Sequence, residues 1–98
     1  MSRYIVKIED KYFEWSTCVD APVTPAMDIN ELKEYIKDEY GRSGLMELPE
    51  RLERVNKQGT SSHLGETVED VILHNMAGKN GEKLTKEEIL EQYAKQGQ

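Results

Sequence analysis

One segment places polar side chains directly after an aromatic run, in an arrangement suited to ligand recognition. Trp15 is followed by the hydroxyls of Ser16 and Thr17 and by the carboxylate of Asp20. The prolines that come next stiffen the connector, and rigid polar loops often hold binding groups. We therefore treat these four residues as candidate contacts for a ligand or partner. In the alternative interpretation, Ser16 and Thr17 fill strand positions and Asp20 caps a turn.

A second set of candidates combines Tyr40 and Arg42 with the loop residues Ser61, Ser62 and His63. Tyrosine and arginine are enriched at binding hot spots. An arginine can meet an anionic group through two hydrogen bonds, and an aromatic ring can stack on a nucleic acid base. The alternatives are that Tyr40 belongs to the core, that Arg42 pairs with a nearby acid, and that the loop residues only form a turn.

The sequence carries no pattern that predicts catalysis, a metal site or a cofactor. A serine next to His63 in sequence does not establish the geometry of a nucleophile and its base. His63, His74 and the single Cys18 complete no zinc spacing, and no pair of the seven glycines fits a Walker or dinucleotide-binding pattern. We therefore expect a protein that is not an enzyme, with no catalytic residues, no metal and no cofactor.

Composition and charge narrow the classes of partner. The chain has 98 residues and a net charge of −6, with 37% hydrophobic and 33% charged residues. The length predicts a single domain over 1–98. Negative charge argues against nucleic acid binding and is compatible with a basic protein partner or with an acidic coat that maintains solubility. The sequence lacks an apolar stretch of membrane length, a signal-peptide pattern and a second cysteine, so we expect a cytoplasmic protein without membrane contact.

The candidate contacts need elements that position them, and the first is a β-hairpin over residues 3–19. Side chains there alternate with a period of two. A turn at residues 10–11 would place Val6 opposite Trp15 and Ile8 opposite Phe13 on one apolar face. Because a lone hairpin is marginal in water, later helices must cover this face. The same register would pair Tyr4 with Thr17, Ile5 with Ser16 and Lys7 with Glu14.

Apolar residues at spacings of three and four then predict helices over 29–40 and 49–58, a helix after Thr67 that places Met76 inward and stops at Gly78, and a last helix after Thr85. Asp28, Thr67 and Thr85 are each followed three residues later by an acid, which predicts a capping box at three of these helix starts. Gly41 suits the end of the first helix, and Pro49 suits the first turn of the second. Whether the second helix begins before Pro49 is left open. The predicted fold class is α+β, with an N-terminal antiparallel β-hairpin packed against three to four α-helices. A third strand at residues 19–23 would extend the hairpin at an edge.

The run YFEWS at residues 12–16, followed by VDAPVT at 19–24, resembles small proteins of tailed bacteriophages that have no assigned activity. The resemblance covers the N-terminal half best. Because those proteins have no assigned activity, it implies only a biological setting, that of a bacteriophage protein, and no functional residues can be carried over. Small acidic phage products often act on host proteins or bind nucleotide signals of host defence. In that setting, the negative charge, the lack of catalytic motifs and the number of tyrosines favour a non-enzymatic accessory protein in the host cytoplasm. Such a protein would bind and modulate a host or phage protein in counter-defence, as a small homo-oligomer. The alternative is a protein that binds a small nucleotide-like ligand.

Overall fold

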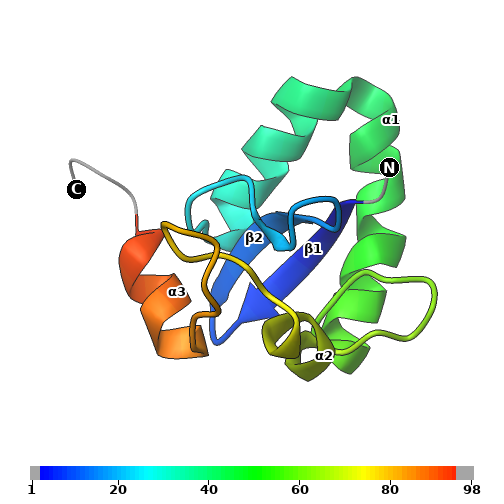
Figure 1. The fold of residues 1–98 in the computed structure, drawn as a ribbon. Helices are drawn as coiled ribbons and strands as arrows, with labels where there is room; N and C mark the ends of the chain where they lie inside the picture. Colours follow the sequence, from blue (N-terminus) through cyan, green and yellow to red (C-terminus); the bar gives the residue numbers. More distant parts are fainter. Residues whose placement is uncertain (1–2, 95–98) are drawn as a thin grey trace.

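An N-terminal antiparallel sheet begins the fold. In the computed structural model, which describes residues 3–94, strands β1 (Arg3–Ile8) and β2 (Lys11–Ser16) form a hairpin. Strand β3 (Ala21–Pro22) pairs with the other edge of β2, giving the order β1-β2-β3 (Figure 1). The third strand is therefore present, and its proline lies at a sheet edge, where a missing N–H is tolerated.

The hairpin turn lies one residue earlier than the sequence predicted. Glu9 takes a positive φ of 58°, and Ile8 pairs with Lys11 across the two-residue loop. Val6 consequently faces Phe13 rather than Trp15, so the predicted register is wrong by two residues. The positive φ that the predicted turn would have required at Lys11 falls on Glu9 instead. A shift of two residues leaves every side chain on its original face, and the predicted apolar face is retained.

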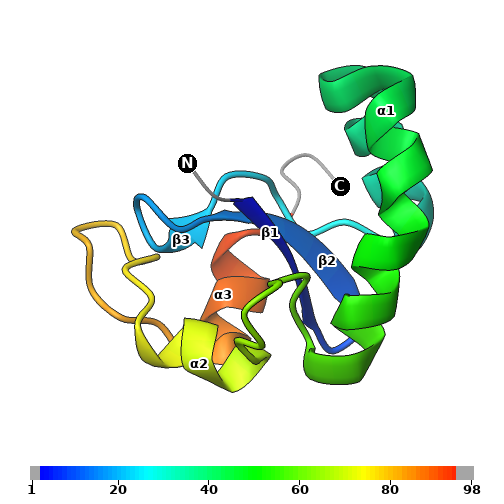
Figure 2. The same cartoon turned by 90° about the vertical axis from the view of Figure 1, so that its right-hand side faces the viewer.

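Both faces of the sheet are covered. Figure 2 shows helix α1 (Ile29–Gln58) on one side, with helices α2 (Val68–Leu73) and α3 (Lys86–Gln92) on the other. The α1 side buries Ile5, whereas the α2 and α3 side buries the predicted apolar face. Each fully buried large apolar side chain contributes about 1.5–3 kcal/mol. The predicted face comprises Val6, Ile8, Phe13 and Trp15, and each of these side chains is at most 1% exposed.

Helix α1 folds back on itself at Gly41, whose φ of 68° and ψ of −155° are not helical. Figure 1 shows the two arms of this corner. A capping box of Asp28 and Glu31 begins the first arm, and the corner ends it where the sequence predicted. The second arm includes Pro49 within the helix, so the predicted start of a helix at residue 49 is too late. The structure thus has three helices within residues 3–94.

Gly44 allows the two arms to pack closely. A Cβ atom at this position would lie 2.5 Å from the Cβ of Tyr40 and 3.0 Å from a methyl carbon of Ile36. The first distance is shorter than Cβ atoms in proteins show and the second is tighter than most, so a side chain at residue 44 would require the arms to shift. The second arm therefore depends on glycine to approach the first.

The two short helices start as predicted and α2 ends early. Thr67 and Thr85 each form a capping box with an acid three residues later. Helix α2 stops at Leu73, and Met76, which helical periodicity placed inward, is 53% exposed. Asn75 is buried in its place. No helix within residues 3–94 has both the length and the apolar composition required to span a bilayer.

Candidate functional site

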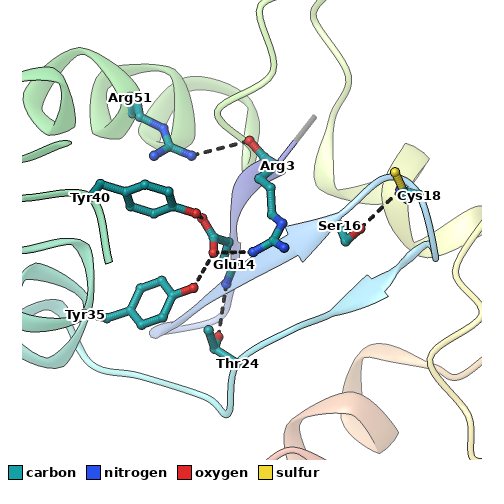
Figure 3. A network of polar contacts seen from close by, with 8 residues as sticks. All are labelled: Arg3, Glu14, Ser16, Cys18, Thr24, Tyr35, Tyr40 and Arg51. Atoms are coloured by element: carbon teal, nitrogen blue, oxygen red, sulfur yellow. Dashed lines mark hydrogen bonds and ion pairs between the residues drawn. The ribbon is translucent and has the colours of Figure 1, made fainter. Parts of the chain in front are cut away.

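A buried carboxylate lies between the sheet and α1. Glu14 is on β2, on the side that faces α1, and is 0% exposed. Its Oε1 accepts hydrogen bonds from Arg3 Nη1 at 3.1 Å and from the hydroxyl of Tyr35, and its Oε2 accepts one from the hydroxyl of Tyr40 at 2.5 Å. Figure 3 shows these donors converging on the carboxylate from β1 and from the first arm of α1. We call these four residues the Glu14 cluster.

The three donors of the Glu14 cluster compensate the buried negative charge of the Glu14 carboxylate. Burial, together with the hydrogen bond to Glu14, raises the pKa of Tyr35 and of Tyr40, so both rings stay neutral. The hydrogen bond to the carboxylate raises the pKa of Arg3. Because both carboxylate oxygens already accept hydrogen bonds, Glu14 is poorly placed to take a proton from a substrate. The cluster is suited to holding α1 and its tyrosines in position on the sheet.

The raised tyrosine pKa values predict that the free energy of unfolding falls as the pH rises above about 10, the ordinary tyrosine pKa. Tyr35 and Tyr40 ionise first in the unfolded chain, so the folded chain then holds more protons. This contribution is complete below pH about 10 and is lost as the pH rises through the folded-state values. Urea titrations between pH about 8 and 11 would measure the slope. A Tyr35→Phe/Tyr40→Phe chain should have a shallower slope, and an unchanged slope would contradict the prediction.

A cleft of about 810 Å³ opens beside the Glu14 cluster. The guanidinium-bearing residues Arg3, Arg51 and Arg54 line it, bringing β1 together with the second arm of α1. We call it the arginine cleft. Its walls also include Tyr4, Tyr40, Ser61 and His63 and the carboxylates of Glu47 and Glu50.

Two of the three arginines have no carboxylate partner. Within residues 3–94 the ion pairs are Arg3 with Glu14 and Lys86 with Glu69. Arg54 donates from Nε to the carbonyl of Ser61 at 2.9 Å, and Arg51 makes only a long 3.4 Å contact with the carbonyl of Arg3. Burial lowers the pKa of Arg51. An anion in the cleft would offset the cost of holding this cation partly away from water.

The predicted contacts of the second set are distributed unevenly. Tyr40, Ser61 and His63 line the arginine cleft. The N–H of Ser61 donates to the carbonyl of Ile5 at 2.9 Å, and its hydroxyl accepts a hydrogen bond from the Ile5 N–H at 2.8 Å, so this serine is held against β1. Ser62 is 2% exposed, and its hydroxyl accepts a hydrogen bond from the backbone of the loop. Arg42 is exposed and does not line the cleft.

The predicted contacts of the first set lie around a different cavity. Trp15, Thr17 and Asp20 line a space of about 130 Å³. Trp15 is 1% exposed and belongs to the core, and the buried Ser16 accepts a hydrogen bond from the Cys18 N–H at 3.2 Å. Tyr4 lies in the wall of both this cavity and the arginine cleft. The two predicted sets are therefore neighbours that do not share one site.

Sequence reasoning missed the residues that give the cleft its charge. Arg51 and Arg54 follow acids at helical spacing, a pattern typical of a solvated helix face. Their own spacing of three residues places both guanidinium groups on one side of the helix, which was the available signal. Glu14, the only acid within the YFEWS strand, was the corresponding signal for the buried cluster.

A groove of about 520 Å³ lies between the connector at 23–28 and the first arm of α1. Part of its wall is apolar and comes from Val23, Pro25 and Met27. We call it the acidic groove because its charged lining residues are Asp28, Glu31 and Glu34, and no lysine, arginine or histidine of residues 3–94 lines it.

No protein-family model, curated protein or solved structure matches the chain. Function must therefore be inferred from the geometry of the cleft and the groove.

Proposed function

We propose that this is a non-enzymatic binding protein that holds a small nucleotide-like anion in the arginine cleft. The observation that carries the proposal is the presence of Arg51 and Arg54 in one cleft with Arg3. Neither Arg51 nor Arg54 forms an ion pair with a carboxylate of residues 3–94. Guanidinium groups bind phosphate oxygens through pairs of hydrogen bonds. The cleft volume of about 810 Å³ lies within the usual range for small-ligand sites.

The other walls favour a ligand that has more than a bare anionic group. Tyr40 offers an aromatic ring that is anchored through its hydroxyl to Glu14 before any ligand binds. A base that stacks on this ring would therefore cost little side-chain conformational entropy. Glu47 and Glu50 can accept hydrogen bonds from amino groups on a base edge. A nucleotide combines these three features, whereas inorganic phosphate would meet the carboxylates unfavourably.

The saturated carboxylate of Glu14 supports binding rather than catalysis. Among the acids of the cleft it is the buried one, and its oxygens already accept three hydrogen bonds. The sequence resembles small proteins of tailed bacteriophages. In that setting, a protein of this kind would sequester a nucleotide signal of host defence. We propose that role for this chain.

Ligand binding is expected to raise the melting temperature in the presence of at least one member of a nucleotide panel that includes cyclic and dinucleotide forms. A ligand at about 100 times its Kd adds about 2.7 kcal/mol of stability. Arg51→Gln should weaken binding about 10–100-fold in calorimetry, because charge-assisted hydrogen bonds contribute about 1.5–3 kcal/mol.

The matched control is Arg42→Gln, which removes the same charge from an exposed position on α1 outside the cleft. It should leave the affinity unchanged. The proposal would be contradicted by an equal loss in both variants, or by the absence of any thermal shift with the whole panel at excess ligand.

A second candidate function is binding and modulation of a host or phage protein, and the acidic groove is the observation that favours it. An apolar wall beside carboxylates suits a protein segment better than a small anion. The immobilised chain should retain one host or phage protein that an unrelated protein of equal net charge does not retain. Failure to retain any such protein from host or phage lysates would count against this function.

A further inference from the structure

We propose that the acidic groove docks a basic segment of a partner protein, which inserts an apolar side chain against Val23 and Met27. This inference deepens the second candidate function and rests on it, and it is independent of the arginine cleft. The groove and the cleft have Tyr35 and Tyr40 of the Glu14 cluster in their respective walls.

The groove presents apolar surface that the fold leaves uncovered. Val23 is 43% exposed next to the strand edge, although its own N–H is bound to the carbonyl of Glu14 at 2.8 Å. Pro25 is exposed beside it, and Met27 below is only 5% exposed. The backbone of Met27 pairs with Tyr12, so this wall is held in place. A rigid apolar wall with an exposed valine can accept an apolar anchor without prior ordering.

The carboxylates of the groove are also fixed in position. Asp28 Oδ1 accepts a hydrogen bond from the Glu31 N–H at 2.8 Å, and Glu31 Oε1 accepts one from the Asp28 N–H at 2.8 Å. Glu34 follows Glu31 by three residues and is exposed on the same side of the helix. Three carboxylates therefore border one apolar wall, and among the described residues that line the groove none is a cation.

Charge complementarity selects the occupant. A second copy of this chain carries the same net charge of −6, so docking two copies through their acidic grooves would oppose like charges. An anionic ligand is also disfavoured in the groove, because the three carboxylates at the start of α1 would repel it. A lysine- or arginine-containing segment meets them favourably and can place an aliphatic or aromatic side chain between its charges. The groove thus fits a basic, amphipathic partner segment.

The test uses a fluorescein-labelled peptide of repeated Lys-Leu-Leu-Lys units as the probe, with a Glu-Leu-Leu-Glu peptide of equal apolar content as its counterpart. Fluorescence anisotropy should show binding of the basic peptide alone. Glu34→Lys should weaken that binding about tenfold, because it sets like charges in contact. Glu53→Lys makes the same charge change at an exposed position of α1 outside the groove and should change the affinity less than about twofold.

A second variant separates the apolar contribution from charge. Val23→Ser leaves the net charge unchanged and should weaken binding of the basic peptide about three- to tenfold, through lost burial. Equal weakening by Glu34→Lys and Glu53→Lys would overturn the proposal, because general attraction to an acidic surface would then explain the binding. Equal binding of the acidic peptide, or no binding of the basic one, would also overturn it.

The same variants distinguish failure of the groove from failure of the function. A partner that the wild-type and Glu34→Lys chains retain equally would preserve the second candidate function and refute docking at the groove. Loss of that partner with Glu34→Lys, but not with Glu53→Lys, is the expected result. Both exposed positions leave the core intact, and circular dichroism would verify that each variant is folded.

Discussion

Replacing Glu14 with alanine is expected to lower the free energy of unfolding by about 3 kcal/mol. The substitution removes the charged acceptor for the hydroxyls of Tyr35 and Tyr40, and a hydrogen bond to a charged group contributes about 1.5–3 kcal/mol. It also opens a void in a fully buried position. Urea denaturation followed by circular dichroism at neutral pH would measure the loss.

Glu14→Gln and Glu47→Ala are the controls for this prediction. Glutamine keeps the volume and one oxygen acceptor but replaces the other with an amide nitrogen. The free energy of unfolding of the Glu14→Gln chain should therefore lie between those of the wild-type and Glu14→Ala chains. Glu47 is exposed at the cleft, and its removal should change stability by less than about 0.5 kcal/mol. A change that small for Glu14→Ala would show that the cluster does not hold α1 to the sheet.

Replacing Asn75 with aspartate should also destabilise the fold by about 3 kcal/mol or more at neutral pH. Asn75 is 2% exposed, and its amide nitrogen donates to the carbonyls of Ile72 and Leu84. Its oxygen accepts from the N–H groups of Ala77 and Leu84. An aspartate cannot donate to those carbonyls, and it would hold a buried charge close to them. Chemical denaturation of the two chains would give the difference.

The pH dependence of the Asn75→Asp chain provides an internal check. Burial should raise the pKa of the new carboxyl above its unfolded value of about 3.9. The protonated acid regains a donor, so the deficit should be smallest below pH about 4 and should grow as the pH rises through the folded-state value. Asn56→Asp, at an exposed position of α1, should cost less than about 0.5 kcal/mol. Equal losses at residues 56 and 75 would contradict the assigned role of Asn75.

Features that depend on neighbouring residues were predictable from the sequence. The alternation in residues 3–8 and 11–16 identified the apolar face, and the capping boxes at Asp28, Thr67 and Thr85 located three helix starts. The register was not predictable in this way, because a shift of two residues satisfies the same alternation. The choice depended on which residue of the turn took the positive φ, and this was Glu9.

Features that depend on distant contacts were missed. Periodicity continued the helix to Met76, but Asn75 bonds to the backbone of Leu84 and ends it earlier. Arg51 and Arg54 belong to a cleft only because their arm of α1 returns beside β1. Tyr40 and His63 were grouped as contacts by residue type, and the fold brings both to the arginine cleft while it leaves Arg42 outside. The candidate site was therefore visible in part, through residue type, while its composition required the fold.

The reversal of α1 at Gly41 links the stability of the protein to its capacity to bind a ligand in the arginine cleft. A straight helix of 30 residues would be about 45 Å long, which exceeds the largest dimension of the molecule, 35 Å. The dihedral angles of Gly41 belong to a region that residues with a side chain avoid. A chain unable to reverse direction there would carry Arg51 and Arg54 away from Tyr40. Selection for a well-packed interior and selection for an intact cleft would therefore both act on this one residue.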